Sequence, residues 1–326
     1  MCKVSIIIPV YNAGERLWDC IESMTSQTLR DIEMIFVLDC PTDGSDQVCE
    51  EYARIDPRIR ILRNETNMHI GLSRNRGLAV ARGEYVAFSD DDDFRERDMY
   101  ETLYRMASEG NRDMVIGLTV NDENGERQVF DYPSLNEQDI RGFALQDLIA
   151  CGGYRDDYPL CINIHPHLYK RSVIEQQHIR FVDTRKVSPE DRLFNIEFLL
   201  AARNVALCCR PLYYHRIYGQ STMHSASYLK SDKVMRYVDS LYDMLCESKA
   251  YALFEPQFII GAAKMLTILP IQELVSTKSI VRFNKAINAL GARPYIEMVY
   301  QHYPLPFSQL LRYRVLEKYI VNRLRK

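Results

Sequence analysis

GEYVAFSDDDDF, at residues 83–94, is a short apolar run with aromatic and β-branched members that ends in four successive carboxylates. We expect the apolar part to form a buried strand that delivers the acids to a cleft. Four adjacent Asp side chains repel one another and do not favour a strand. They therefore either lie in solvent or hold something positive among them.

Three earlier strand-like runs precede this stretch. They are Val4–Val10, Ile32–Leu38 and Ile59–Leu62, and helical patterns separate them. Strands that alternate with helices predict an α/β fold with a mainly parallel sheet. In such sheets, ligands bind outside the carboxyl ends of the strands. Tyr11, Asp39 and Asp90 stand at those ends, so we expect them to converge on one site. We also expect Asn12 to cap the helix after the first strand.

The strand pattern stops near Met223, and a helical spacing of apolar residues takes over. We therefore predict an α/β domain at 1–222 and a helical region at 223–326. The last fifteen residues carry six basic side chains and one acidic side chain. An amphipathic helix resting on an anionic membrane surface would have this pattern. So would the solvated face of an ordinary terminal helix, and we favour that second interpretation.

The composition excludes several classes of protein. A formal net charge of −3 and a pI near 6.2 argue against nucleic-acid binding. The nine cysteines include no Cys-x-x-Cys pair, so neither a zinc site nor a disulfide framework is indicated. No apolar run is long enough for a signal peptide or a membrane span. We expect a cytoplasmic protein, at most peripheral at the inner face of the cell membrane. The sequence leaves open whether it forms a homo-oligomer.

Four motifs, in order along the chain, carry a resemblance to a known family. They read VSIIIPVYN at 4–12, TDGS at 42–45, GLSRNRG at 71–77 and GEYVAFSDDDD at 83–93. Together they resemble the family 2 glycosyltransferases over roughly the first two thirds of the chain, and the ordered set is far more specific than any one motif. The resemblance implies a GT-A fold, which is Rossmann-like with helices flanking the sheet. It also implies a nucleotide-sugar donor and inversion at the anomeric carbon.

The four carboxylates match the D-x-D motif of this family. By the resemblance, Asp92 binds a divalent cation and Asp90 faces the donor, with Asp91 in support. Asp91 and Asp93 form a second, less favoured register. Carboxylate oxygens suit Mn²⁺ or Mg²⁺, and such a cation stabilises the charge on a departing nucleotide diphosphate. His215 stands where the family closes its donor site, and we assign it to metal or phosphate.

Further donor contacts follow from the resemblance in the first three motifs. Tyr11 would offer a ring to the base and Asp39 a carboxylate to a base N–H, while Pro9 shapes the end of the first strand. Arg74 would reach the diphosphate as a bidentate donor, or else be an ordinary surface arginine of its helix. The family has an Asp-Asp-Gly-Ser run where this chain reads LDCP at 38–41. The identity of the base is therefore open, and uracil is the leading interpretation.

SPED at residues 188–191 resembles the Glu-Asp signature of the family at the start of a helix. An inverting transfer needs a base on the face opposite the leaving group. The resemblance assigns that role to Asp191, with Glu190 binding the acceptor or holding the geometry. From spacing alone, Ser188 and Asp191 would instead form a capping box. His165 and His167 are spare candidates for phosphate or metal contact, and lone histidines are more often structural.

These assignments predict a metal-dependent inverting glycosyltransferase. It would move a sugar from a UDP-sugar to a hydroxyl of a saccharide or lipid-linked saccharide, and the resemblance implies bacterial surface-polysaccharide or glycolipid assembly. A sugar-phosphate nucleotidyltransferase is the first alternative, although residues 9–16 lack the Gly-rich, basic phosphate loop that it needs. The second alternative is a non-catalytic sugar- or nucleotide-binding protein of the same fold, against which the retained acids count.

Overall fold

The computed structural model describes residues 2–123, 125–129, 140–151, 163–218 and 231–266, together with 281, 285 and 293–295. The chain divides into two compact units. The first comprises Met1–Leu145, Leu160–Arg185 and Glu190–Ser225, and the second comprises Gln146–Pro159, Lys186–Pro189 and Ala226–Lys326. Compared with the expected division into 1–222 and 223–326, two short earlier segments therefore group with the later part of the chain.

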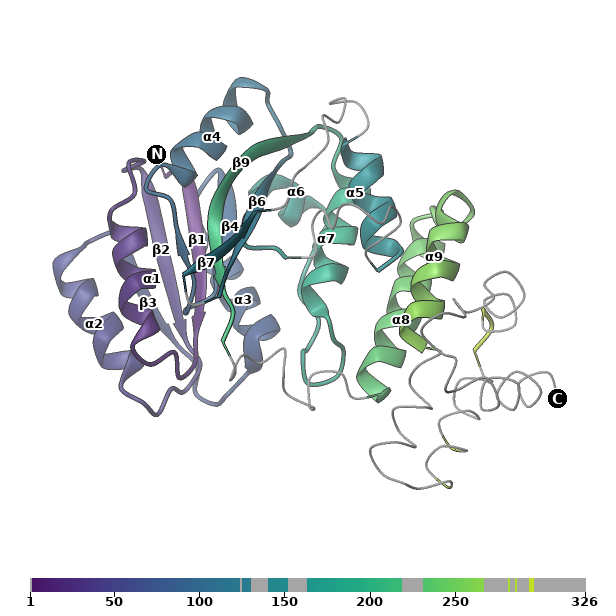
Figure 1. The fold of residues 1–326 in the computed structure, drawn as a ribbon, viewed down its shortest axis with the longest axis horizontal. Coiled ribbons are helices and arrows are strands. Elements are labelled where there is room, and N and C mark those ends of the chain that lie inside the picture. The colour runs from purple at the N-terminus through teal and green to yellow at the C-terminus, as the bar shows by residue number, and fades with distance from the viewer. Residues whose placement is uncertain are drawn as a thin grey trace. The chain divides into compact units, whose positions relative to one another are not determined.

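Within the described residues, a sheet of nine strands forms the centre of the first unit (Figure 1). The strands are β1 (Val4–Val10), β2 (Ile32–Leu38), β3 (Ile59–Arg63), β4 (Tyr85–Phe88), β5 (Phe94–Arg95), β6 (Met114–Glu123), β7 (Glu126–Val129), β8 (Leu168–Lys170) and β9 (Val205–Arg216). Their order is β3-β2-β1-β4-β8-β6-β9-β5, and β7 pairs with β6. The first four in that order run parallel, whereas β8 is antiparallel to both its neighbours. The predicted α/β class is confirmed, with a parallel half and a mixed half.

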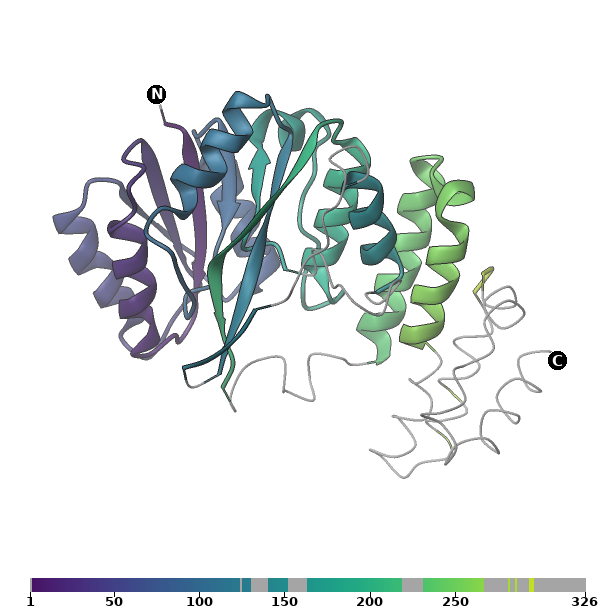
Figure 2. The ribbon, with the colours of Figure 1, turned by 45° about the horizontal axis from the view of Figure 1, so that its top comes forward.

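Helices flank the strands, as the alternating pattern predicted. The described helices are α1 (Arg16–Thr25), α2 (Ser45–Ile55), α3 (His69–Val80), α4 (Met99–Glu109), α5 (Ile140–Ile149), α6 (Arg171–Gln176), α7 (Glu190–Ala201), α8 (Ser231–Glu247) and α9 (Tyr251–Leu266). In Figures 1 and 2, α1 and α2 lie on one side of β1–β3 and α3 lies on the other. The expectation that Asn12 caps α1 is wrong, because α1 begins only at Arg16. Asn12 Oδ1 instead accepts a hydrogen bond from the Thr42 N–H at 2.7 Å.

An aromatic cluster holds the end of β4 in place. The Phe88 ring meets the rings of Tyr169, Phe181 and Phe194 edge to face, with centroids between 5.0 and 5.6 Å apart. Neighbouring β1 is buried along its whole length, because the sheet is covered on both faces there. The four carboxylates therefore begin at a firmly packed point of the sheet.

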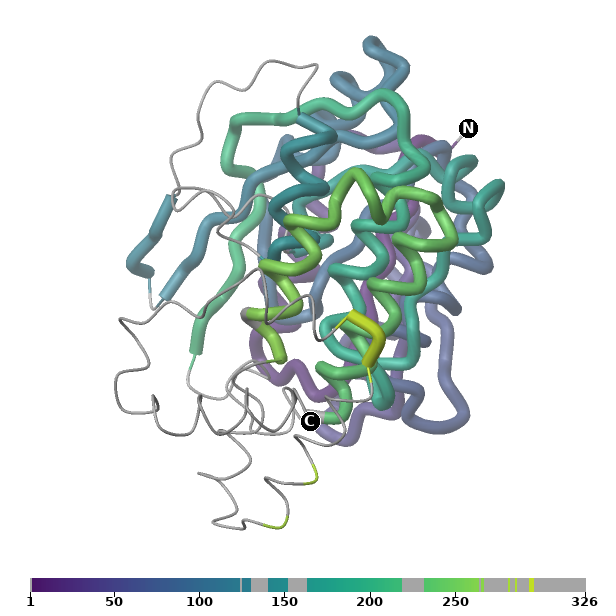
Figure 3. Tube along the Cα trace, turned by 90° about the vertical axis from the view of Figure 1, so that its right-hand side faces the viewer, coloured from purple at the N-terminus to yellow at the C-terminus, as the bar shows by residue number. Residues whose placement is uncertain are grey.

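The described part of the second unit is helical, and α8 and α9 lie side by side (Figure 3). Four aromatic rings pack together here with centroid separations of 5.1 to 5.7 Å; they belong to Tyr242, Tyr251, Phe258 and Tyr295. Among the described helices, none has the length and apolar character needed to cross a membrane. The basic stretch at 312–326 lies outside the described residues, so its membrane contact stays a prediction.

Candidate active site

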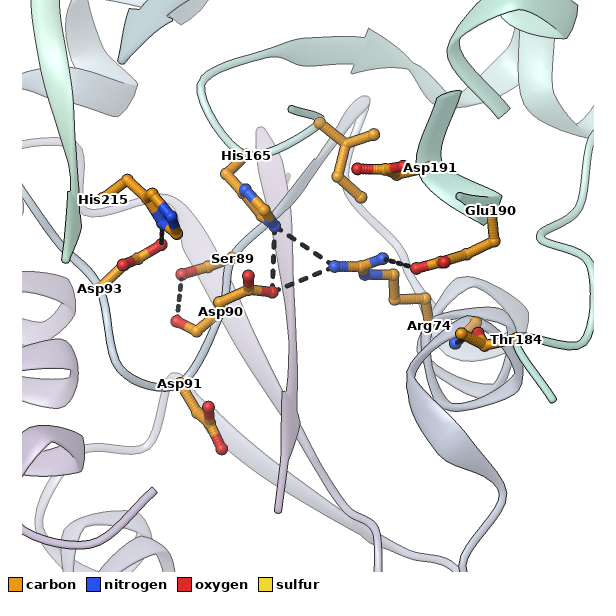
Figure 4. Close-up of polar contacts among 12 residues, drawn as sticks. Arg74, Ser89, Asp90, Asp91, Asp93, His165, Thr184, Glu190, Asp191 and His215 are labelled. Carbon is orange, nitrogen blue, oxygen red and sulfur yellow. Dashed lines mark hydrogen bonds and ion pairs between the residues drawn. The ribbon is translucent and has the colours of Figure 1, made fainter. Parts of the chain in front are cut away.

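The four carboxylates at 90–93 follow β4, and Asp90, Asp91 and Asp93 point in different directions (Figure 4). Asp91 Oδ2 accepts a hydrogen bond from the Tyr11 N–H at 2.8 Å. Asp92 Oδ2 accepts one from the Tyr218 hydroxyl at 2.6 Å. Asp91 therefore connects the acids to the end of β1, and Asp92 connects them to the chain that follows β9. Separate partners relieve part of the repulsion expected among four adjacent acids.

Asp93 is the interior member of the four, with none of its surface exposed. Its Oδ2 accepts a hydrogen bond from the Tyr213 hydroxyl at 2.7 Å and lies 3.3 Å from His215 Nδ1. Its Oδ1 accepts a hydrogen bond from the Arg216 N–H at 2.9 Å. Burial by itself would lower the pKa of His215, but the hydrogen bond to Asp93 raises it to about 9. Asp93 therefore holds β9 beside the acids. The predicted metal role of His215 stays a prediction.

The remaining acids suit a divalent cation. Burial, followed by the charge of Asp92, raises the pKa of Asp91 well above its usual range. Burial, followed by the charge of Asp93, raises the pKa of Asp92 to about 6. A bound Mn²⁺ or Mg²⁺ would reverse both effects. Ligand atoms of Asp90, Asp93 and His165 lie within 4.8 Å of one another. Among these three, Asp93 is already engaged through both oxygens.

Asp90 differs from its neighbours because two basic groups face one of its oxygens. Asp90 Oδ1 lies 3.0 Å from Arg74 Nη2 and 3.0 Å from His165 Nε2. Burial by itself would raise the pKa of Asp90, but His165 and Arg74 hold it well below its usual range. Asp90 is therefore kept ionised. In Figure 4, Asp93 and His215 lie on the opposite side of Asp90 from Arg74.

Arg74 lies in α3 and is buried, with 2% of its side chain exposed. The alternative that it is an ordinary surface arginine is therefore wrong. Its Nη1 donates to Glu190 Oε1 at 3.0 Å, and its Nη2 donates to Asp90 Oδ1 at 3.0 Å. One guanidinium thus joins the acid at the end of β4 to the acid at the start of α7 (Figure 4).

Glu190 and Asp191 open α7, where the helix dipole favours acidic side chains. Glu190 is buried, and burial, followed by the charge of Asp191, raises its pKa to about 7, with Arg74 acting in the opposite direction. Asp191 is half-buried, and its Oδ1 accepts a hydrogen bond from the Arg192 N–H at 2.8 Å. Ser188 Oγ has no hydrogen-bond partner among the described residues, so the capping box is not formed. Asp191 is the more accessible acid of the pair.

The ends of β1 and β2 carry the side chains expected for the nucleotide. Tyr11 is 53% exposed, so its ring is available for stacking. Asp39 is buried, and its Oδ1 accepts hydrogen bonds from Asn64 Nδ2 at 2.6 Å and from the Met68 N–H at 2.7 Å. Pro9 lies within β1. Because β2, β1 and β4 are adjacent and parallel, their carboxyl ends meet at one edge of the sheet, where this class of fold binds ligands.

Sequence reasoning missed two tyrosines of the site. Tyr213 and His215 stand two residues apart in β9, and such residues project from the same face of a strand. That spacing is a signal for Tyr213 once β9 is identified as a strand. Tyr218 carries no comparable local signal, because it reaches Asp92 across 126 residues. His165 was a spare candidate, and the structure puts it against Asp90.

Known proteins resemble this chain in sequence and in fold. The sequence profile described as Glycosyl transferase family 2 matches residues 5–157. The putative glycosyltransferase EpsH of Bacillus subtilis (strain 168) is 32% identical over 67% of this chain and 62% of its own length, so this chain spans less than two thirds of that relative. The poly(ribitol-phosphate) beta-N-acetylglucosaminyltransferase TarP of Staphylococcus aureus (strain N315) is 28% identical over 77% of this chain and 74% of TarP.

A solved structure extends the likeness over nearly the whole chain. The crystal structure of S. aureus TarS 1–349 in complex with UDP-GlcNAc matches with a TM-score of 0.73 and 20% identity. The match covers 99% of this chain and 89% of the TarS chain. At that identity the likeness shows the fold alone, and it confirms the expected GT-A architecture.

Proposed function

The chain belongs to family 2 of the glycosyltransferases, and on that premise we propose that it transfers a sugar from a nucleotide-diphosphate donor to an acceptor hydroxyl with inversion. One observation carries the proposal. The buried Arg74 joins a donor-side acid, Asp90, to Glu190, the chain neighbour of Asp191. An inverting transfer needs both sets: groups that manage the leaving diphosphate, and a base for the acceptor.

The proposed donor is a UDP-sugar. UDP-GlcNAc is the first one to test, because the TarS structure of the same fold contains it. The exposed ring of Tyr11 would stack on the base, and the Asp39 carboxylate would accept a hydrogen bond from a base N–H. Asp90, which Arg74 and His165 keep ionised, would accept hydrogen bonds from hydroxyls of the donor.

The proposal includes Mn²⁺ or Mg²⁺, with Asp92 as the main protein ligand and Asp90, Asp91 and His215 close to it. When bound, the cation would stabilise the negative charge that develops on the departing diphosphate. The raised pKa values of Asp91 and Asp92 support this assignment, because burial and neighbouring carboxylates outweigh the groups that stabilise their charge. The Tyr218 hydroxyl donates a hydrogen bond to Asp92. When the ion binds, Tyr218 would either keep this hydrogen bond beside the ion or lose it.

Asp191 is the proposed general base. It would take the proton of the acceptor hydroxyl while the oxygen attacks the anomeric carbon from the face opposite the nucleotide. Glu190 is buried and paired with Arg74, so its proposed role is to hold this geometry. The proposed acceptor is a saccharide or lipid-linked saccharide of a bacterial surface polymer, in line with the polymer named for TarP. Family membership counts against the nucleotidyltransferase alternative.

The experiment that tests this function is a thermal-shift screen of the full chain against UDP, GDP and a panel of nucleotide sugars, with and without Mn²⁺. A ligand at 100 times its Kd stabilises the folded state by about 2.7 kcal/mol, so donors are ranked before the acceptor is known. NMR of the transferred product then reports the anomeric configuration. The absence of any stabilising nucleotide sugar, or retention of configuration, would refute the proposal.

A further inference from the structure

Both terminal nitrogens of Arg74 already bind carboxylates of the protein. Its Nη1 is engaged by Glu190 and its Nη2 by Asp90, each at 3.0 Å. The remaining Nε is buried and has no partner among the described residues. A planar guanidinium holds two carboxylates at a separation set by its rigid fork, whereas a lysine ammonium is a single point charge on a flexible stem. The geometry suits a link between two acids that lie far apart in the sequence.

His165 supports the same Asp90 oxygen from a second direction. Its Nε2 lies 3.0 Å from Asp90 Oδ1, and its ring is stacked on Tyr213, with the centroids 5.5 Å apart and the planes at 14°. With its proton on Nε2 the ring donates to the Asp90 oxygen, and the same nitrogen lies 3.3 Å from Arg74 Nη2. Asp90 Oδ1 thus receives two donors at once. The carboxylate is held in one orientation, with its other oxygen left for the donor substrate.

The helix that carries Arg74 is itself locked to the segment that leads to α7. Asn75 Nδ2 donates to the Phe181 carbonyl at 2.8 Å, and the Phe181 N–H donates to Asn75 Oδ1 at 2.9 Å. At Gly71 a Cβ atom would lie 2.4 Å from the Val182 carbonyl oxygen, so only glycine permits this approach. The Gly71 N–H donates to Thr184 Oγ1 at 3.0 Å. These contacts prevent α3 from shifting relative to the segment at 181–184.

We propose that Arg74 is a positioning residue, which sets the Asp90 and Glu190 carboxylates in fixed relation, and that it does not bind the donor diphosphate. The inference rests on the proposed function and deepens it. Arg74 aligns the acid that contacts the donor with the acid beside Asp191, so that the base faces the anomeric carbon. Such alignment matters because a small misplacement of reacting groups lowers the rate without weakening nucleotide binding.

The test separates turnover from nucleotide affinity. We expect Arg74→Gln to lower kcat for the donor ranked first in the screen by about 100-fold. We expect the Kd of UDP, measured by calorimetry with Mn²⁺, to change by less than about threefold. If Arg74 instead bound the diphosphate, Arg74→Gln would remove charge-assisted hydrogen bonds to it. UDP binding would then weaken about tenfold or more. Arg54→Gln, at an exposed site of α2, is the matched control and should change neither quantity.

A second pair of variants tests the link itself. Glu190→Gln should lower kcat, and the double variant with Arg74→Gln should be little worse than either single change, because both break one unit. If Arg74→Gln does not fold, Arg74→Lys decides. Lysine keeps the buried charge but replaces the rigid two-nitrogen fork with one point of contact on a flexible stem, so the two acids lose their fixed relation and kcat should still fall while UDP binding persists. Wild-type kcat in Arg74→Lys would overturn the proposal.

The outcomes also distinguish this inference from the proposed function. A wild-type chain that neither binds UDP nor turns over any screened nucleotide sugar refutes the function. An active wild type, together with an Arg74→Gln variant whose UDP affinity falls while kcat is unchanged, refutes only the positioning role.

Discussion

Replacing Asn75 with Ala removes the pair of hydrogen bonds that joins α3 to Phe181. The bonds are reciprocal, at 2.8 Å from Asn75 Nδ2 to the Phe181 carbonyl and at 2.9 Å from the Phe181 N–H to Asn75 Oδ1. The substitution therefore leaves one backbone donor and one backbone acceptor without their partner. Both groups are partly buried, so water replaces the lost bonds incompletely.

The size of the effect follows from these two bonds. An unpaired buried polar group costs about 1–3 kcal/mol, and partial burial puts each group near the lower end. We therefore expect Asn75→Ala to lower the free energy of unfolding by about 2 kcal/mol. For a domain of this size, that corresponds to a midpoint lower by roughly 4–8 °C. Because Arg74 is the adjacent residue, kcat should fall as well.

The assay is urea and thermal unfolding of the full chain, followed by donor turnover. Asn67→Ala is the matched control, because Asn67 makes an exposed hydrogen bond to the nearby His69 N–H; it should cost about 0.5 kcal/mol. Asn75→Asp keeps the acceptor but replaces the donor with an oxygen, so it should be at least as destabilising as Ala at pH 7. If Asn75→Ala is no less stable than Asn67→Ala, the paired hydrogen bonds between Asn75 and Phe181 contribute nothing to stability. These bonds would then not hold α3 against the segment at 181–184.

Three further predictions concern a buried acid, the proposed general base and the proposed metal ligand. Burial by itself would raise the pKa of Glu33, but hydrogen bonds from Ser5 and Arg60 lower it below its usual 4.5. Its contribution to stability is therefore present above pH 4.5 and lost as the pH falls through the folded pKa. Glu33→Gln should cost about 1–3 kcal/mol at pH 7, and urea unfolding should show the gap from wild type closing toward acid; a gap independent of pH would contradict this. Asp191→Asn should lower kcat by about 100- to 10,000-fold with UDP affinity retained in calorimetry, and unchanged turnover would remove Asp191 from its role. Asp92→Ala should weaken Mn²⁺ binding measured by titration calorimetry, and undiminished binding would favour the second register of acids.

Local sequence signals were reliable where an element is buried on both faces. β1 and β2 have the bounds that their apolar runs predicted, because a strand covered by helices leaves an unbroken apolar signature. The strand ends at Tyr11, Asp39 and Asp90 followed from that topology. The failed prediction at Asn12 has a local cause. The residue has a left-handed φ of 54° and contacts the turn after β2, and its own neighbourhood does not encode that contact.

The sequence by itself therefore determined the parallel core, the edge where the site lies and the family of the chain. Only the tertiary structure decided the partner of each carboxylate. Arg74 meets Glu190 across 116 residues, and Tyr213 meets Asp93 across 120. The physical reason is that a periodic apolar pattern is a local property, whereas an ion pair depends on how separate elements pack. Burial of Arg74 between two acids follows from the docking of α3 against the segment before α7, and no single stretch of the chain specifies that docking.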